Sequence, residues 1–279
     1  MKKIGFVDYY ISEWHANNYP DWMAACENLG GEYKIAYAWA ELDVSPEDGV
    51  TTAQWCEKYG AEKCDTIEEL CEKSDVIVIL APSNPETHLR YAEKVLTYGK
   101  RTYIDKTFAP DLETAKKIFA IAEKYNTPFF SSSALRYATE LDEYPACKSV
   151  MTTGGGDSPE EYIIHQAEMV VKKMGTGASE ICATSICGQL SFHIKYNDDR
   201  EALMIYGTGI PFAAYMTAEG KSSKYKAAKS SYFKILAADI LRFFEEGTTS
   251  FDGSETLEVM KIRDGVLKSV KALGEWIAL

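Results

Sequence analysis

The sequence predicts an α/β protein in two parts. The first is a doubly wound parallel sheet over about residues 1–135, and the second is an α+β domain with a mostly antiparallel sheet over 136–279. In the first part, short apolar segments alternate with amphipathic helical segments, which is the pattern of βαβ units. In the second part, three strand-like segments follow one another with only turns between them, which is typical of an antiparallel sheet.

The elements of the first part follow from apolar periodicity and from residues that start or stop helices. Threonine or aspartate precedes several of the helical segments, and glycine closes several of them. The expected strands are 3–7, 33–39, 75–81, 101–104 and 128–131. The expected helices are 19–29, 51–59, IEELCEK after Asp65 or Thr66, 86–98, and LETAKKIFAIAEKYN after Asp111.

In the second part, Asp198 and Asp199 fall in the turn of an expected hairpin. The lysine-rich segment 221–231 is the one segment that we expect to be mobile. The expected strands are 148–153, 180–187, 189–196 and 201–206, and the expected helices are 158–174, 232–246 and 255 to about 273.

Composition restricts the class of function. The formal net charge is -12, which disfavours binding to nucleic acid or to an anionic membrane. The apolar segments are too short to span a bilayer, and Asp8 interrupts the first of them, so we expect a first strand and not a signal peptide. The seven cysteines are scattered without a CxxC pair, which favours a cytoplasmic protein with neither disulfides nor a zinc site.

The segment 74–106 carries the strongest functional signal. It reads as a strand that ends at Pro82, a helix that ends at Gly99, and a strand that delivers Asp105 and Lys106. In a parallel sheet the carboxyl ends of the strands line the ligand crevice. A lysine at this position is placed to do chemistry, although a solvated loop charge is the commoner case.

Three motifs in this order resemble the Gfo/Idh/MocA family of oxidoreductases. They are Ala81-Pro82 with His88 nearby, Asp105-Lys106-Thr107 at the end of the fifth strand, and Glu161-Y-I-I-His165 on a helix of the second part. The resemblance implies a Rossmann domain, a second domain with an antiparallel sheet, and NAD or NADP as cofactor. It also implies hydride transfer on a sugar, polyol or related hydroxy compound.

The resemblance assigns roles to three of these residues. His165 would be the general acid or base, Lys106 would polarise the substrate oxygen, and Glu161 would orient the imidazole. Taken alone, the residues also permit a solvated stripe of Glu161, His165, Glu168 and Lys172. Ser158 and Glu161 also form a capping box, and capping could be the sole role of Glu161. If Lys106 and His165 act together, their side chains must reach a common cleft.

The first turn departs from the family pattern G-x-G-x-x-G/A. Asp8, Tyr10 and Glu13 occupy the glycine positions, and Tyr9 lies between the first two. A tyrosine ring and two carboxylates oppose a pyrophosphate that approaches the backbone. We therefore expect weak or shifted binding of NAD or NADP. Glu41, after the second strand, is a candidate ligand for a ribose hydroxyl.

Further residues are candidates for contact with a ligand in the cofactor cleft. His15 has a core or capping role as its equal alternative, and His88 is expected to be a helix-face residue outside the site. The other candidates are Trp14, Asn17, Asn18, Pro82, Ser83 and Asn84. A second departure is Thr107 in place of the family's proline, so the Lys106–Thr107 bond is either cis at a cost or trans.

The leading interpretation is thus an NAD(P)-dependent oxidoreductase with a small-molecule substrate, no metal, and a homo-oligomer formed through the open face of the second sheet. The alternative is a non-redox relative whose remodelled cofactor cleft binds a small ligand or a partner protein. A third interpretation retains a bound cofactor but catalyses net hydrolysis or elimination.

Overall fold

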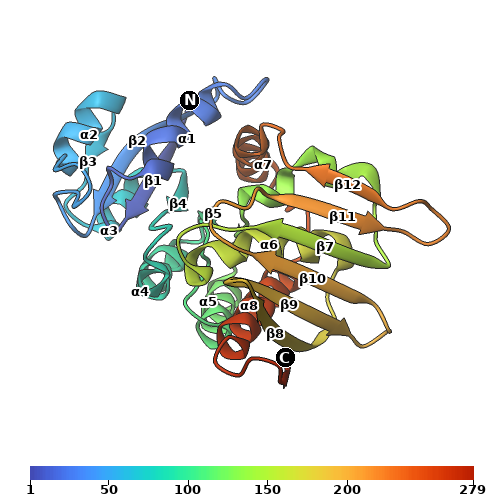
Figure 1. The fold of residues 1–279 in the computed structure, drawn as a ribbon. Helices are drawn as coiled ribbons and strands as arrows, with labels where there is room; N and C mark the ends of the chain where they lie inside the picture. Colours follow the sequence, from blue (N-terminus) through green and yellow to red (C-terminus); the bar gives the residue numbers. More distant parts are fainter. The chain divides into compact units, whose positions relative to one another are not determined.

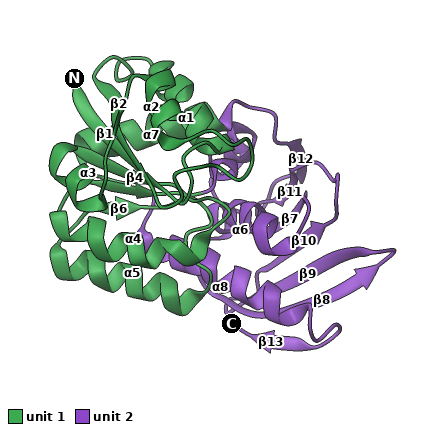
Figure 2. Cartoon of the chain, turned by 90° about the vertical axis from the view of Figure 1, so that its left-hand side faces the viewer, with its two compact units in different colours: residues 1–132, 233–250 green, residues 133–232, 251–279 purple.

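The computed structural model describes all residues 1–279, and the chain divides into two compact units. Unit 1 holds residues 1–132 and 233–250, and unit 2 holds residues 133–232 and 251–279 (Figure 2). The expected division into 1–135 and 136–279 therefore omitted one feature: the segment 233–250 returns to unit 1.

Unit 1 contains a six-stranded sheet in which every pair of neighbours is parallel (Figure 1). This order confirms the doubly wound parallel sheet. Its centre is fully buried, with Phe6, Val78 and Tyr103 at the core. In sheet order the strands are β3 (Glu62–Lys63), β2 (Tyr33–Ala40), β1 (Lys2–Asp8), β4 (Val76–Ile79), β5 (Thr102–Ile104) and β6 (Phe129–Phe130).

The helices of unit 1 begin largely where their capping residues predict. Thr51 and Gln54 form a capping box, and Thr66 and Asp111 each accept a backbone N–H at a helix start. The helices are α1 (Trp14–Ala24), α2 (Thr52–Tyr59), α3 (Ile67–Lys73), α4 (His88–Val95) and α5 (Leu112–Tyr125), with the 3-10 turns η1 (Pro85–Thr87) and η2 (Leu96–Tyr98) around α4.

The expected bounds of α1 were wrong. The helix was expected over 19–29, but it begins at Trp14 and ends at Ala24. Proline is favoured in the first turn of a helix and disfavoured inside one, so the sequence favours a start near Pro20. The buried Glu13 carboxylate supplies the cap instead, and α1 continues through Pro20.

The helix α7 (Tyr232–Glu246) has the bounds that the sequence predicts, and it packs on the sheet of unit 1. The ring of Phe243 lies 5.0 Å from that of Phe130 at the end of the sheet. Arg101 donates to the backbone oxygens of Phe244 and Glu245 at 2.6 and 2.8 Å, which fixes the end of the helix beside β5. Long-range contacts of this kind leave no signal in local sequence.

Unit 2 contains a seven-stranded sheet that is antiparallel except for the pair β7 and β10. The helices α6 (Pro159–Met174) and α8 (Gly253–Ser269) pack on one face and leave the other face open (Figure 1). In sheet order the strands are β12 (Lys224–Ala227), β11 (Ala213–Thr217), β7 (Ser149–Gly154), β10 (Glu201–Tyr206), β9 (Gln189–Tyr196), β8 (Ala178–Ile186) and β13 (Trp276–Ala278).

The strands that the sequence did not predict are short and lie at a sheet edge, as β3, β12 and β13 do, or next to one, as β11 does. The segment 221–231, expected to be mobile, contains β12, which pairs with β11. The 3-10 turns η3 (Ala134–Tyr137) and η4 (Thr139–Glu143) follow the boundary between the units. The hairpin around Asp198 and Asp199 is confirmed.

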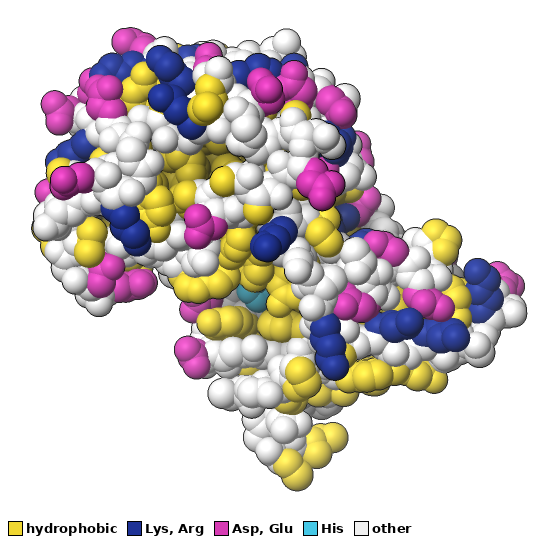
Figure 3. All heavy atoms as spheres, turned by 90° about the horizontal axis from the view of Figure 1, so that it is seen from above, with side chains coloured by type: hydrophobic (Ala, Val, Ile, Leu, Met, Phe, Trp, Pro, Cys, Tyr) yellow, Lys and Arg dark blue, Asp and Glu magenta, His cyan; other side chains and the backbone are white.

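Acidic and basic side chains intermingle over the face seen in Figure 3, although acidic residues are in excess in the chain. None of the helices combines the length and the apolar character that a membrane span requires.

Candidate functional site

The carboxyl ends of β1, β4 and β5 lie next to one another in the sheet of unit 1. The backbone pairing continues beyond the strands, because Leu80 N–H donates to Val7 O at 2.8 Å and Asp105 N–H donates to Ile79 O at 2.9 Å. The Ala81 N–H also donates to the side chain of Asp8 at 2.9 Å. The turns that carry Pro82 and Lys106 are therefore held in place by the sheet.

Asp105 anchors the turn that presents Lys106. Its carboxylate is fully buried, accepts the Lys106 N–H at 2.8 Å, and pairs with Nδ1 of His15. Burial opposes ionisation of Asp105, but the charges of His15 and Lys106 outweigh it and lower the pKa of Asp105 below its ordinary value. The Lys106–Thr107 peptide bond is cis, and Lys106 itself is only 9% exposed.

His15 and His88 are both buried and both form hydrogen bonds around this turn. Nδ1 of His15 forms a hydrogen bond with Asp105, and the ring packs edge-on against Tyr19. These contacts favour a core role over ligand contact. His88 lies on the buried face of α4, with Nε2 2.5 Å from Leu80 O and Nδ1 3.0 Å from Phe108 O. Burial lowers the pKa of His88. This side chain joins the turn after β4 to the turn after β5.

The first turn is filled by side chains of the chain itself. The Glu13 carboxylate accepts the N–H groups of His15, at 2.7 Å, and of Ala16. These are donors at the start of α1, where a dinucleotide-binding turn offers N–H groups to a pyrophosphate. In this chain a buried carboxylate already takes them.

Carboxyl groups predominate in this turn, and burial favours their neutral forms. Burial raises the pKa of Glu13 to about 7, and burial together with the nearby Glu13 raises the pKa of Asp8 well above its ordinary value. One oxygen of Asp8, Oδ2, is buried without a hydrogen-bond partner. We call Asp8, Glu13, His15 and Asp105 the Asp105 cluster.

Neighbouring side chains complete the packing of the first turn. Tyr10 donates its hydroxyl to Glu47 at 2.7 Å, and the rings of Tyr9 and Tyr10 meet edge-on with centroids 6.0 Å apart. Asn17 accepts the indole N–H of Trp55 at 3.0 Å. The turn therefore resembles a packed loop more than an open phosphate cradle.

The remaining candidates in unit 1 have identified partners. Glu41 follows β2 and accepts from Tyr91 at 2.7 Å and from Arg90, so a ribose hydroxyl would have to share this carboxylate. Asn84 donates to Glu86 at 3.1 Å. Trp14 is 52% exposed and Asn18 donates to its backbone oxygen at 2.7 Å. Pro82 is buried, and its carbonyl accepts the Thr107 N–H at 3.4 Å.

His165 lies on α6 of unit 2 and is held from behind by a buried serine. Its Nδ1 forms a hydrogen bond of 2.5 Å with Ser133 Oγ, and its ring meets those of Tyr162 and Phe212 edge-on. Ser133 thus provides a hydrogen bond at Nδ1 of the ring, whatever Glu161 does. Glu161 donates its backbone N–H to the capping Ser158 at 3.4 Å, and an orienting role for its carboxylate stays a prediction.

A buried ionic network fixes Ser133. Glu168 accepts the Ser133 N–H at 3.0 Å and the Arg136 Nε–H at 2.7 Å. Arg136 also donates twice to Glu255 on α8, at 2.9 Å each, and lies 4.0 Å from the centroid of the Phe251 ring. We call Ser133, Arg136, Glu168 and Glu255 the Arg136 cluster.

The Arg136 cluster was missed by sequence reasoning. A solvated stripe was one of the alternatives for Glu168, but the side chain is buried, and burial raises its pKa although Arg136 opposes this effect. The only sequence feature that could have pointed to a role for Glu168 is its helical spacing, which places it near His165 and one turn before Lys172. The predicted convergence of Lys106, in unit 1, with His165, in unit 2, stays a prediction.

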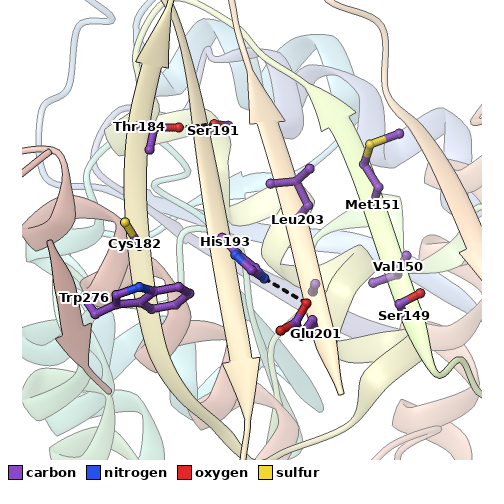
Figure 4. Close-up of a pocket in the computed structure, with 11 residues that line it drawn as sticks. Ser149, Val150, Met151, Cys182, Thr184, Ser191, His193, Glu201, Leu203 and Trp276 are labelled. Carbon is purple, nitrogen blue, oxygen red and sulfur yellow. Dashed lines mark hydrogen bonds and ion pairs between the residues drawn. The ribbon is translucent and has the colours of Figure 1, made fainter. Parts of the chain in front are cut away.

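The open face of the second sheet carries a hollow of about 470 Å³ (Figure 4). His193 on β9 pairs with Glu201 on β10 at 3.1 Å, and the ring of Trp276 meets that of His193 edge-on. Met151 and Leu203 form an apolar part of the lining. No group of three or more His, Cys, Asp and Glu side chains in the chain is arranged to hold a metal ion.

Comparison with known proteins finds a family model that matches part of the chain and a relative that matches a shorter part. Residues 40–132 match the model of the Gfo/Idh/MocA oxidoreductase family with an NAD-binding Rossmann fold. The chain is 32% identical to the uncharacterized oxidoreductase YhhX of Escherichia coli over 57 residues, which are 20% of this chain and 16% of YhhX.

Solved structures agree over the whole chain. A putative myo-inositol dehydrogenase from Sinorhizobium meliloti has a TM-score of 0.78 at 12% identity, covering 100% of this chain and 99% of that one. A scyllo-inositol dehydrogenase from Lactobacillus casei with bound NAD(H) and scyllo-inositol has the same TM-score, identity and coverage. These likenesses confirm the predicted fold.

The family model supports a nicotinamide dinucleotide as cofactor, and β1, β4 and β5 are neighbours in the parallel sheet, so that their carboxyl ends share one edge. The first turn does not fit a pyrophosphate in the ordinary pose, however. Glu13 takes the N–H groups of His15 and Ala16, and Asp8 adds a second buried carboxyl. A bound dinucleotide must shift its pyrophosphate or displace Glu13.

Proposed function

We propose that this chain, whose residues 40–132 match the Gfo/Idh/MocA family model, is an NAD(P)-dependent oxidoreductase acting on a sugar, polyol or related hydroxy compound. The observation that carries the proposal is the position of Lys106 at the carboxyl end of β5, on a turn locked by the buried Asp105. The cofactor supplies the hydride acceptor or donor.

The side chains would handle the proton and the oxygen of the substrate. Lys106 would donate a hydrogen bond to the substrate oxygen, which gains negative charge as its proton leaves. His165 would take that proton, because an imidazole titrates near neutral pH. In the opposite direction His165 would return the proton to the oxygen.

The test begins with cofactor binding. Fluorescence titration of the purified protein with NADH and NADPH should give weak binding, and Glu13→Gly should strengthen it by removing the carboxylate from the start of α1. Submicromolar binding to the unaltered protein would contradict the obstructed pyrophosphate site. Glu57→Gln, an exposed change on α2, is the control.

The second step is turnover, followed through nicotinamide absorbance with a panel of inositols, sugars and sugar acids. His165→Ala should lower the rate on the best substrate by about a hundredfold or more, the usual scale for a general acid or base. His193→Ala, on the open face of the second sheet, should leave the rate within about twofold of the unaltered protein. Equal effects of both changes would remove His165 from the proposed chemistry.

The second candidate is a non-redox relative that binds a small ligand. The carboxylate of Glu13 at the start of α1 favours it, because this arrangement excludes an ordinary dinucleotide pose. Failure of both NADH and NADPH to bind, even to the Glu13→Gly variant, would favour this candidate.

We also propose that the open face of the second sheet pairs with a second copy of the chain. Large apolar side chains on this sheet are partly exposed, among them Tyr215 and Trp276 at 42% and 40%. Light scattering of the protein and of Leu203→Lys tests this: the variant should shift toward monomer. A monomeric unaltered protein would contradict the proposal.

A further inference from the structure

Ser133 contacts the imidazole of His165 at Nδ1. It is fully buried, its Oγ lies 2.5 Å from Nδ1 of His165, and the same Oγ accepts the Leu135 N–H at 3.3 Å. A hydroxyl has one hydrogen and two acceptor lone pairs, so Ser133 Oγ can take the N–H of Leu135 and either accept from a protonated Nδ1 or donate to an unprotonated one. The tautomer of His165 decides between these two directions.

The position of Ser133 is itself fixed. Its backbone N–H is bound by Glu168, which is bound in turn by Arg136, and Arg136 reaches Glu255 on another helix. The serine therefore sits on a buried ionic network that leaves it little freedom to move. Groups held in this manner set the geometry of a neighbouring side chain.

We propose that Ser133 is a positioning residue that keeps the hydrogen of His165 on Nδ1 and leaves Nε2 as the nitrogen that exchanges the substrate proton. This inference rests on the proposed function for its catalytic meaning. An imidazole that takes a proton at Nε2 carries a hydrogen on Nδ1 both before and after the transfer. A bond from Nδ1–H to Ser133 Oγ therefore persists throughout, and the ring need not turn.

The test measures the tautomer directly and needs no substrate. The chain has four histidines, so ¹⁵N-histidine labelling gives a simple spectrum in which His165→Gln identifies the signal of His165. At roughly pH 8.5, above the ordinary pKa of histidine, we expect the shifts of a protonated Nδ1 and an unprotonated Nε2. Ser133→Ala should lose this pattern, and Ser133→Thr, which keeps the hydroxyl, should restore it.

The other three histidines report whether each variant is folded, and Ser191→Ala on the open sheet face is the matched control. If Ser133→Ala does not fold, Ser133→Val, which has the shape of the threonine variant and offers no acceptor, replaces it. A hydrogen on Nε2 of His165 in the unaltered protein would overturn the inference. An unchanged pattern in the Ala or Val variant would do the same.

Kinetics separate this inference from the proposed function. With a substrate from the panel, Ser133→Ala should lower kcat by about tenfold, the loss of one positioned hydrogen bond, and Ser133→Thr should recover most of it. One outcome is that the protein oxidises or reduces no member of the panel while its His165 tautomer still depends on Ser133. That result would support the positioning role of Ser133 and contradict the proposed activity.

Discussion

The Asp105 cluster supports Lys106 and the Arg136 cluster supports His165, and the two clusters balance charge differently. In the Asp105 cluster, three buried carboxyl groups are accompanied by His15 and by the neighbouring Lys106. In the Arg136 cluster, Glu168 and Glu255 share one guanidinium that donates to both.

The two clusters differ in whether their charged groups change protonation near neutral pH. Burial raises the pKa of Glu13 to about 7, so the Asp105 cluster exchanges protons in the physiological range. Arg136 remains charged at any pH of interest, since burial of its guanidinium is outweighed by Glu168 and Glu255, which raise its pKa further. The first cluster can respond to pH and to an anionic ligand, whereas the second is a fixed support.

Removal of the guanidinium should have the largest effect on stability. Arg136→Met leaves the buried Glu168 without its charge partner, which typically costs about 3–5 kcal/mol. We expect urea unfolding to show this loss, and hydrogen exchange to show it in α6. Adding Glu168→Gln should restore much of the stability, because the uncompensated charge is then gone.

Arg242 on α7 offers the control for this change. It pairs with Asp239 and Glu246 at a partly exposed position, so Arg242→Met should cost at most about 1 kcal/mol. Equal losses for the two arginines would contradict the distinction between a buried support and a surface pair.

The Asp105 cluster predicts a stability that depends on pH near neutrality. The pKa of Glu13 is higher in the folded state than its ordinary 4.5, so the folded chain binds this proton more tightly. Stability therefore falls as pH rises from about 4.5 to about 7, by on the order of 3 kcal/mol for a shift of this size. Glu13→Gln should flatten that dependence and stabilise the protein at pH 8.

Urea unfolding at pH 5, 6, 7 and 8 measures this effect, and the exposed Glu57→Gln should retain the slope of the unaltered protein. A flat profile in the unaltered protein would show that Glu13 titrates normally. A slope retained in Glu13→Gln would assign the effect to Asp8, whose pKa burial also raises.

Local pattern accounts for most of the fold and for the loss of the glycine motif in the first turn, but not for the contacts that support the site. The bounds of α7 were predicted, because its periodicity is local, whereas its return to unit 1 depends on Arg101 and Phe130, more than a hundred residues away. The absence of glycine at positions 8, 10 and 13 predicted an altered cofactor site. That Glu13 would cap α1 depends on the geometry of the turn, which the sequence does not display.

The support of His165 was beyond prediction for the same reason. Glu161 has the correct helical spacing, yet Ser133, on a turn thirty-two residues earlier, provides the bond to Nδ1. Arg136 and Glu255 are 119 residues apart. In a single sequence, nothing distinguishes Ser133 from the two serines that precede it.

The smallest expected effect tests whether the first turn depends on its buried carboxylate or on its surface contacts. Tyr10→Phe keeps the ring and removes only the hydroxyl that donates to the exposed Glu47 at 2.7 Å. A partly exposed hydrogen bond of this kind contributes about 0.5–1 kcal/mol, because water replaces the lost partner. We expect that loss in urea unfolding at pH 7 and no change in the affinity for NADH, since the ring still occupies its position. Tyr225→Phe, at an exposed site on β12, should have no effect. Suppose instead that Tyr10→Phe lowered the free energy of unfolding by as much as the pH-dependent change assigned to Glu13. Surface contacts would then stabilise the turn more than its buried carboxylate does, and the contrast between the Asp105 cluster and the Arg136 cluster would lose its physical basis.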